Sequence, residues 1–434
     1  MTDNINHNRR HFLQSSALGL TALSTFPKLA LAKNNTPKTQ ANPDFKADVE
    51  IEFISRDAYV PIIKDGQKTK VQKYFAKLLK GPKHTLVELE DNYLGPTLNY
   101  KQGQKVRIYY KNRLSEPSVI HWHGLHVPSK MDGNPMYAID NGETFVYEFE
   151  ILNRAGTYWY HAHTHSLTAK HVYSGLAGFF IVSDDEEQKL KLPRGEFDVP
   201  LVIQDRNFDQ QNQLKYSNGM MQRMHGFLGD QMMVNGRPDF ELPVATRAYR
   251  MRLLNGSNSR IYKLAWDDGT PIKVIGTDGG LLERAETLPY LTLAPAERRE
   301  IWVDFSDKKI GTELTLRSLE FTASGMGMMG GGMGRMGGGG MRRGGMMGGG
   351  MGGGQSHAGG DFAVLKVRVS KKMSSNDVLP KRLSKIIPLR LADAENPQAP
   401  RRITLSMRHM SALLNGRSYK MNDIREDEII PVNT

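Results

Sequence analysis

Residues 145–151 read Phe-Val-Tyr-Glu-Phe-Glu-Ile, in which every second residue is large and apolar. A period of two is typical of a β-strand that buries one face. Convincing amphipathic helices are scarce, and a glycine-rich run at 175–178 leads directly into an apolar stretch. The sequence therefore predicts an all-β protein made of tandem Greek-key β-sandwich domains. The same alternation recurs at 249–253, 301–305 and 365–369.

The chain length indicates more than one domain, because 434 residues are more than one ordinary domain contains. An acidic run at 184–187 closes a first domain, predicted at 45–186, and a second domain is predicted at 196–370. Proline-rich, basic sequence predicts a linker at 371–402. Further strands are predicted within residues 403–434, but a segment of about thirty residues cannot bury a sandwich core. We expect them to open a third domain that is incomplete in this sequence.

The N-terminus has the features of an export signal. Residues 9–13 read Arg-Arg-His-Phe-Leu, an apolar run continues to Phe26, and Ala30-Leu31-Ala32 has a small-x-small cleavage pattern. Together they predict a twin-arginine signal peptide over residues 1–32, and export to the periplasm by the twin-arginine machinery. The alternative is a basic tail. No later stretch is apolar enough to span a bilayer, so no membrane span is predicted.

The formal net charge is +12, and there is no cysteine. The lysines and arginines are scattered among acidic residues, without a basic stripe interleaved with aromatic residues. This pattern predicts a solvated basic surface and no nucleic-acid partner. An exported chain without disulfides must be held together by its cores.

Histidines are concentrated in one region, since seven of the thirteen lie between His121 and His171. They include two pairs at strand spacing, His121-Trp122-His123 and His161-Ala162-His163. Residues two apart on a strand face the same side, with Cα atoms about 6.5 Å apart. This spacing suits two neighbouring metal ions better than one. Two such strands side by side would bring four imidazoles together, and imidazole binds copper, zinc, iron and nickel alike.

The alternative for one such pair is a half-buried core histidine beside an aromatic residue. Two pairs about forty residues apart favour a metal site. His165 would share a face with His161 and His163 and is a candidate third or supporting member. His126 and His171 lack a partner at strand spacing, which predicts surface or supporting roles. The isolated histidines carry no prediction: His7, His11, His84, His225, His357 and His409.

These motifs resemble those of the multicopper oxidases. Residues 121–125 (His-Trp-His-Gly-Leu), followed by Asp132-Gly133, resemble the first copper motif of that family. Residues 158–163 (Tyr-Trp-Tyr-His-Ala-His), followed by Gly-Leu-Ala-Gly at 175–178, resemble the second. The resemblance covers roughly residues 45–434 and is strongest to periplasmic cuprous oxidases of bacterial copper resistance. Segments of the middle domain also match: 229–230, 235–236, 252–255 and 277–280.

The resemblance implies three cupredoxin domains, with a trinuclear copper cluster between the first and third. By motif, His121 would bind the type 2 copper, and His123, His161 and His163 would bind the type 3 pair. Asp132 matches the family's acid near the cluster, which assists proton delivery; the alternative is an exposed turn aspartate. The implied reaction oxidises Cu(I) or a phenol-like donor and reduces dioxygen to water, in copper tolerance.

The resemblance also shows what this sequence lacks. The family's other cluster ligands lie in third-domain H-x-x-H-x-H and H-C-H motifs, and the latter supplies the type 1 copper cysteine. A blue-copper site needs a thiolate, so we expect half the cluster ligands and no type 1 site. The sequence is then a fragment, or a protein without oxidase chemistry. The main alternative is a non-enzymatic periplasmic copper-binding or storage protein; a structural relative without copper and a zinc nuclease or hydrolase are more distant.

A glycine-rich segment at 325–354 contains nine of the 22 methionines. Such a composition cannot bury a core, so we expect a flexible loop. Thioethers favour Cu(I), which makes this loop a candidate Cu(I) collector; the alternative is a low-complexity insertion without a ligand. The methionines are Met326, Met328, Met329, Met333, Met336, Met341, Met346, Met347 and Met351.

Overall fold

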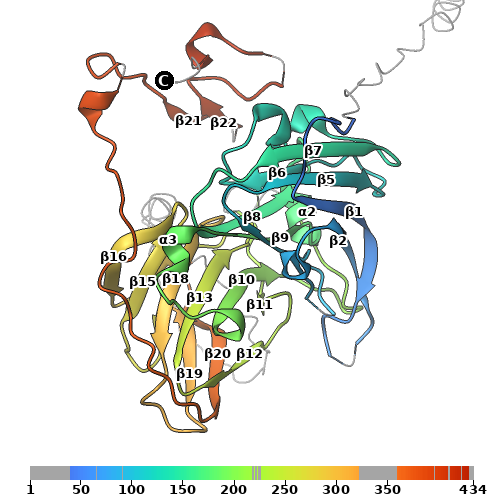
Figure 1. The fold of residues 1–434 in the computed structure, drawn as a ribbon. Coiled ribbons are helices and arrows are strands. Elements are labelled where there is room, and N and C mark those ends of the chain that lie inside the picture. The colour runs from blue at the N-terminus through green and yellow to red at the C-terminus, as the bar shows by residue number, and fades with distance from the viewer. Residues whose placement is uncertain are drawn as a thin grey trace, which may run out of the picture. The chain divides into compact units, whose positions relative to one another are not determined.

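The computed structural model describes residues 40–321 and 359–429, apart from 65, 90, 218, 220, 221, 223–225, 395, 409, 410 and 422. The predicted signal peptide and all nine methionines of the predicted loop lie outside the described residues. Four large sheets and one hairpin account for most of the described chain, which confirms the all-β prediction of cupredoxin-like sandwiches (Figure 1). In the part of the chain that is described, no helix is long and apolar enough to cross a bilayer.

The first sandwich packs a four-stranded sheet, β2-β1-β5-β7, against a five-stranded sheet, β3-β4-β9-β8-β6. β1 runs parallel to β5, and β4 runs parallel to β9, so these neighbours are joined by crossovers and not by hairpins. The strands are β1 (Val49–Val60), β2 (Thr69–Lys80), β3 (Leu86–Val87), β4 (Thr97–Lys101), β5 (Lys105–Asn112), β6 (Ile120–His123), β7 (Thr144–Glu150), β8 (Gly156–Ala162) and β9 (Ala177–Ser183).

The core of the first sandwich follows from the alternation in its strands. Phe145, Tyr147 and Phe149 of β7 all point inward and are buried. They meet Trp122 of β6 and Tyr160 of β8, which come from the opposite sheet and are fully buried. The Trp122 and Tyr147 rings lie edge to face, with centroids 5.2 Å apart. Aromatic packing of this kind fixes the position of β6 against the other sheet.

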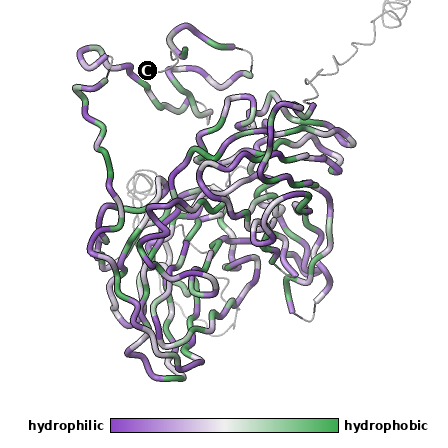
Figure 2. Tube along the Cα trace, viewed as in Figure 1, coloured by the Kyte–Doolittle hydropathy of each residue, from purple (hydrophilic) through white to green (hydrophobic). Residues whose placement is uncertain are grey.

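The second sandwich has a six-stranded sheet, β11-β10-β13-β18-β15-β16, and a five-stranded sheet, β12-β20-β19-β14-β17. Figure 2 shows hydrophobic and hydrophilic residues alternating along many of these strands. The strands are β10 (Asp198–Arg206), β11 (Gln231–Val234), β12 (Glu241–Ala245), β13 (Ala248–Asn255), β14 (Tyr262–Trp266), β15 (Ile272–Thr277), β16 (Gly280–Leu288), β17 (Leu291–Leu293), β18 (Arg298–Asp304), β19 (Glu313–Ser318) and β20 (Phe362–Lys371).

The remaining described elements are short. β21 (Leu405–Arg408) and β22 (Ser411–Leu414) form a separate hairpin. The domain limits predicted from the sequence remain predictions. The helices are α2 (Thr168–Ser174) and α3 (Asp185–Gln188), with 3-10 turns η2 (Lys83–Thr85), η3 (Ser129–Met131), η4 (Pro135–Tyr137), η5 (Gly195–Phe197), η7 (Leu391–Asp393) and η8 (Glu426–Glu428).

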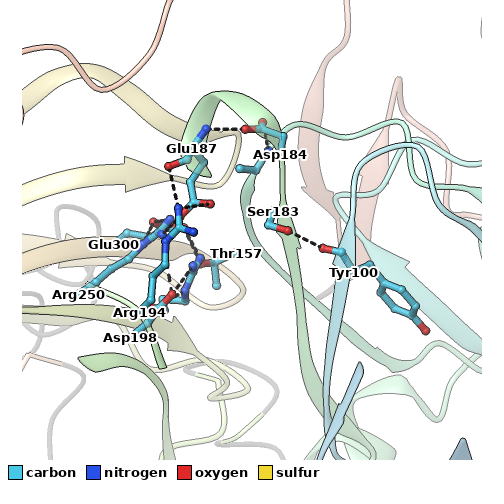
Figure 3. A network of polar contacts seen from close by, with 11 residues as sticks. Tyr100, Thr157, Ser183, Asp184, Glu187, Arg194, Asp198, Arg250 and Glu300 are labelled. Atoms are coloured by element: carbon cyan, nitrogen blue, oxygen red, sulfur yellow. Dashed lines mark hydrogen bonds and ion pairs between the residues drawn. The ribbon is translucent and has the colours of Figure 1, made fainter. Parts of the chain in front are cut away.

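The polar face of β13 is buried, although alternation alone would place it in solvent. Arg250 and Arg252 are buried, and both bond to Glu300 of β18. Figure 3 shows Arg250 and Glu300 side by side. Glu300 accepts hydrogen bonds from Arg250 Nη2 at 2.6 Å and from Arg252 Nη1 at 2.9 Å. Thr157 of β8 donates to the same carboxylate at 2.7 Å. A largely buried ionic network, which also includes Glu187 and Asp198, therefore joins the two sandwiches.

Part of the segment predicted as a linker is docked. Leu383 is fully buried beside Trp302 in a small core of the second sandwich. Ser384 donates a hydrogen bond to Glu186, at 3.0 Å, and also accepts one from Arg154 of the first sandwich. Residues 383–384 therefore form a strap that contacts both sandwiches.

Candidate metal centre

The two histidine motifs lie on adjacent antiparallel strands. In the register of β6 and β8, His121 is opposite His161, and His123 is opposite Trp159. The backbone N–H of His163 donates to the Val119 carbonyl at 3.0 Å, which extends the same register past the end of β8. Because side chains alternate along a strand, the four histidines share one face. The two strands are therefore neighbours, which is the condition under which the sequence predicts that the imidazoles come together.

The imidazoles of this face, which we call the imidazole face (His121, His123, His161 and His163), are in contact. Donor atoms of His121, His123 and His161 all lie within 4.8 Å of one another. His123 Nδ1 is 3.2 Å from His161 Nε2. The centroids of the His121 and His163 rings are 5.1 Å apart. Three nitrogen ligands thus surround one small volume, and the His163 ring lies beside that of His121.

His165 does not join them, so the expectation that it shares their face is wrong. β8 ends at Ala162, and the chain then turns, with Ser166 at φ 61°. His165 is exposed, and its ring centroid lies 5.7 Å from that of Tyr419. His171 has a structural place in the fold: it is fully buried on α2, and its Nε2 lies 3.2 Å from the Glu116 carboxylate. His126 is exposed.

Asp132 holds His121 in place through two contacts. His121 Nδ1 lies 2.6 Å from the Asp132 backbone oxygen and 3.3 Å from its carboxylate. The ring therefore donates its Nδ1 proton to Asp132 and leaves Nε2 free for a metal. Carboxylate or carbonyl support of this kind fixes the tautomer and orientation of a ligating imidazole.

Gly133 allows that contact, because it lies directly against β6. A Cβ at this position would be 2.1 Å from the Ile120 carbonyl oxygen and 2.6 Å from the His121 Cα. Its φ of 80° is also one that side chains other than glycine rarely adopt. The Asp-Gly pair is therefore needed for the close approach of this loop to the imidazole face.

Replacing Gly133 with alanine is expected to lower the free energy of unfolding and displace Asp132 from His121. The matched control is Gly103→Ala, because Gly103 has φ 87° but a Cβ there would meet no described atom within 4 Å. The backbone cost is then common to both variants, and the clash is confined to Gly133. We expect Gly133→Ala to cost about 1–3 kcal/mol more than the control, measured by urea denaturation. Equal costs would contradict this account.

Protonation of the imidazole face is set by burial and by neighbouring charges. Burial and the nearby Arg298 guanidinium lower the pKa of His123 to about 4. Burial also lowers the pKa of His161, well below its usual value, and that of His163. Burial acts on His121 in the same direction, but hydrogen bonds with Asp132 raise its pKa overall. At neutral pH the first three rings are neutral, as metal binding requires.

The residues present fit a transition metal. His163 Nδ1 is buried, and no group in the described ranges forms a hydrogen bond with it. An orphaned imidazole nitrogen beside three others is costly unless an ion binds it. Nitrogen ligands of this type suit copper, zinc, iron or nickel. Sequence reasoning missed two neighbours of this centre, which carry no metal-ligand pattern. The Arg298 charge lowers the pKa of His123, and Trp159 stacks on His123 and His161.

Comparisons with known proteins agree on a family. A family model described as "Multicopper oxidase" matches residues 70–187. "Multicopper oxidase mco" of Staphylococcus aureus is 38% identical over 240 residues, 55% of this chain and 53% of that protein. "Cell division protein FtsP" of Xenorhabdus nematophila is 41% identical over 220 residues, 50% of this chain and 46% of that protein. The chain thus spans about half the length of the curated relatives it matches.

A solved structure extends the match. McoA multicopper oxidase from the hyperthermophile Aquifex aeolicus has a TM-score of 0.68 and 31% identity, covering 86% of this chain and 72% of that chain. The multicopper oxidase from Campylobacter jejuni has the same fold, with a TM-score of 0.65. Because both H-x-H strands lie in the matched region and the identity extends over most of the Aquifex protein, the chain belongs to the multicopper oxidase family.

Proposed function

We propose that this chain is the copper-binding part of an exported oxidoreductase that couples oxidation of Cu(I) or a phenol-like donor to reduction of dioxygen to water, in copper tolerance. The observation that carries the proposal is the imidazole face, where donor atoms of three histidines lie within 4.8 Å of one another. A largely buried cluster of imidazoles in contact with one another has little structural use without a metal. The twin-arginine pattern at residues 9–13 supports a periplasmic location.

The proposed ligands are His121, His123, His161 and His163. Copper bound there would supply redox chemistry toward dioxygen. His121 presents Nε2, because its Nδ1 faces Asp132. The Asp132 side chain is 45% exposed, so it can exchange protons with solvent while it contacts His121. This position suits a group that delivers protons to the centre. The Met-rich loop at 325–354 remains a proposed Cu(I) collector.

Replacing Asp132 with asparagine is expected to weaken copper binding by roughly tenfold, at the lower end of the 10–100-fold range for such supporting residues. The loss is moderate because the backbone oxygen of Asp132 still accepts from His121. Affinity would be measured by competition with a chelator. Asp140→Asn, an exposed aspartate downstream of the same loop, is the control. An unchanged affinity in Asp132→Asn would contradict the supporting role.

A non-enzymatic copper-binding or storage protein is the second candidate. It is favoured by the convergence of the histidines within this chain alone, which can hold copper without completing a catalytic cluster. A third candidate is a role without copper, because several relatives carry the name "Cell division protein FtsP". The four aligned imidazoles argue against the third candidate.

One experiment separates the three. The metal-depleted chain is reconstituted with copper, copper per chain is measured, and oxygen uptake is followed with Cu(I) and with a phenol. The intact mass of the protein from its native source is determined alongside. Copper binding with donor-dependent oxygen uptake supports the oxidase. Bound copper without uptake, in the full natural product, favours storage. Absence of bound copper overturns both.

A further inference from the structure

Trp159 belongs to the core between the sandwiches and also stacks on the imidazole face. Its ring centroid lies 4.3 Å from that of His161, with 35° between the planes, and 5.1 Å from that of His123, at 33°. The side chain is 4% exposed. The indole therefore restricts the tilt of two imidazoles at once, on the side opposite to solvent.

Trp159 belongs to a hydrophobic cluster to which the second sandwich also contributes. The same hydrophobic cluster contains Val202 and Leu254, on β10 and β13, together with Met233 on β11. Phe179 and Ala177 of β9 are among the residues that the first sandwich contributes to the cluster. The hydrophobic surroundings of the indole are thus built partly from the second sandwich.

The alternation of side chains along β8 explains why Trp159 contacts the imidazole face and also belongs to the core between the sandwiches. Thr157, Trp159 and His161 all point to the same side, because they are two residues apart. Thr157 bonds to Glu300 of the second sandwich at 2.7 Å, Trp159 packs on that sandwich, and His161 belongs to the imidazole face. A single strand face therefore carries docking contacts at one end and metal ligands at the other.

We propose that Trp159 is a positioning residue through which the second sandwich, which contributes no imidazole to the described centre, sets the geometry of His123 and His161. The inference rests on the proposed copper site. It predicts that the second sandwich affects copper affinity and coordination geometry, in addition to stability. Without the second sandwich, the indole would be held on one side only, and it would restrict the tilt of His123 and His161 less. The preorganisation of these two ligands would then be lost.

The test compares Trp159→Leu and Trp159→Phe with Trp302→Leu in the full chain. Trp302 is equally buried, at 4% exposure, but it packs in the separate core that contains Leu383. Each variant is titrated with Cu(II) in competition with a chelator, and the EPR spectrum of the bound copper is recorded. Melting temperature without metal reports the purely structural effect.

We expect Trp159→Leu to weaken copper binding by about tenfold or more and to change the copper hyperfine splitting. Trp159→Phe, which retains a stacking ring, should recover most of the affinity. Trp302→Leu should lower the melting temperature without changing either copper readout. Leu254→Ala, which removes a second-sandwich member of the cluster that contains the indole, should move the EPR parameters in the same direction as Trp159→Leu.

The outcomes separate the two proposals. If the wild-type chain binds no copper, the proposed function fails. If it binds copper, and both Trp159 variants match it in affinity and spectrum, the positioning role alone is overturned. Should Trp159→Leu fail to fold, Leu254→Ala still decides, because it alters the same cluster without removing the indole: wild-type affinity and spectrum in that variant would overturn the positioning role.

Discussion

Replacing Glu300 with alanine is expected to lower the free energy of unfolding by about 3 kcal/mol, at the lower end of the range for a broken buried ion pair. Both guanidinium groups lose a shared buried carboxylate, while Arg250 keeps Glu187 and Arg252 keeps Asp198. Arg250 is fully buried and Arg252 nearly so. Both bond to the Glu300 carboxylate, as does Thr157 of the first sandwich. Urea denaturation of the metal-free chain measures the change. We also expect two resolved transitions, since the network is a main polar link between the sandwiches.

The control for this variant is Glu283→Ala. Glu283 lies on β16 of the same sandwich, but its side chain is 52% exposed and pairs with Arg382, which is 61% exposed. An exposed pair contributes roughly 0–1 kcal/mol. If Glu300→Ala costs no more than Glu283→Ala, the network does not have the stabilising role inferred from its geometry.

The same network has a defined pH dependence. Burial alone would raise the pKa of Glu300, but the Arg250 and Arg252 charges lower it from 4.5 to about 2. A depressed carboxyl pKa contributes stability above the unfolded-state pKa and loses it as the pH falls through the folded-state value. The stability difference between wild type and Glu300→Gln should therefore shrink between pH 4.5 and pH 2.

Replacing His161 with alanine is expected to have the largest effect on the metal. His161 is the most buried ring of the imidazole face, with 6% exposure, and its Nε2 lies closest to His123. Loss of a direct ligand should weaken copper binding by on the order of 100-fold or more, beyond the range for supporting residues. Chelator competition gives the affinity, and EPR shows whether the remaining rings still bind one ion.

An exposed histidine provides the matched control. His84 lies on η2, away from the imidazole face, so His84→Ala should bind copper as the wild type does. A His161→Ala protein with an affinity within about threefold of wild type would show that the copper lies elsewhere. In that case the Met-rich loop becomes the leading candidate, and the oxidase proposal loses its main observation.

Much of the fold was readable from the sequence because the strands repeat a period of two. Phe145, Tyr147 and Phe149 were expected in a core and are buried there. The imidazole face was also predictable, since each H-x-H pair places its rings on one side. The imidazole face also requires that the two strands be neighbours, and the sequence alone does not determine strand pairing.

What could not be predicted involves surfaces buried between sandwiches. Arg250 and Arg252 have the pattern of a solvated strand face, and only their contact with Glu300 shows otherwise. Trp159 reads as one more aromatic core residue. His165 satisfies the spacing rule but lies beyond the end of β8, because β-strand periodicity ends where the chain turns. Local pattern thus predicts which residues pack, but not against which partner.

The order of the strands along the chain has a consequence for synthesis. Every ligand of the imidazole face has been translated by residue 163, whereas the second sandwich closes only when β20 ends at Lys371. At typical elongation rates this separation of about 200 residues takes roughly 10–40 s. During that interval the nascent chain carries a finished set of histidines without the domain that packs on Trp159. Premature capture of a metal ion by the growing polypeptide is therefore a hazard that follows directly from this order of domains.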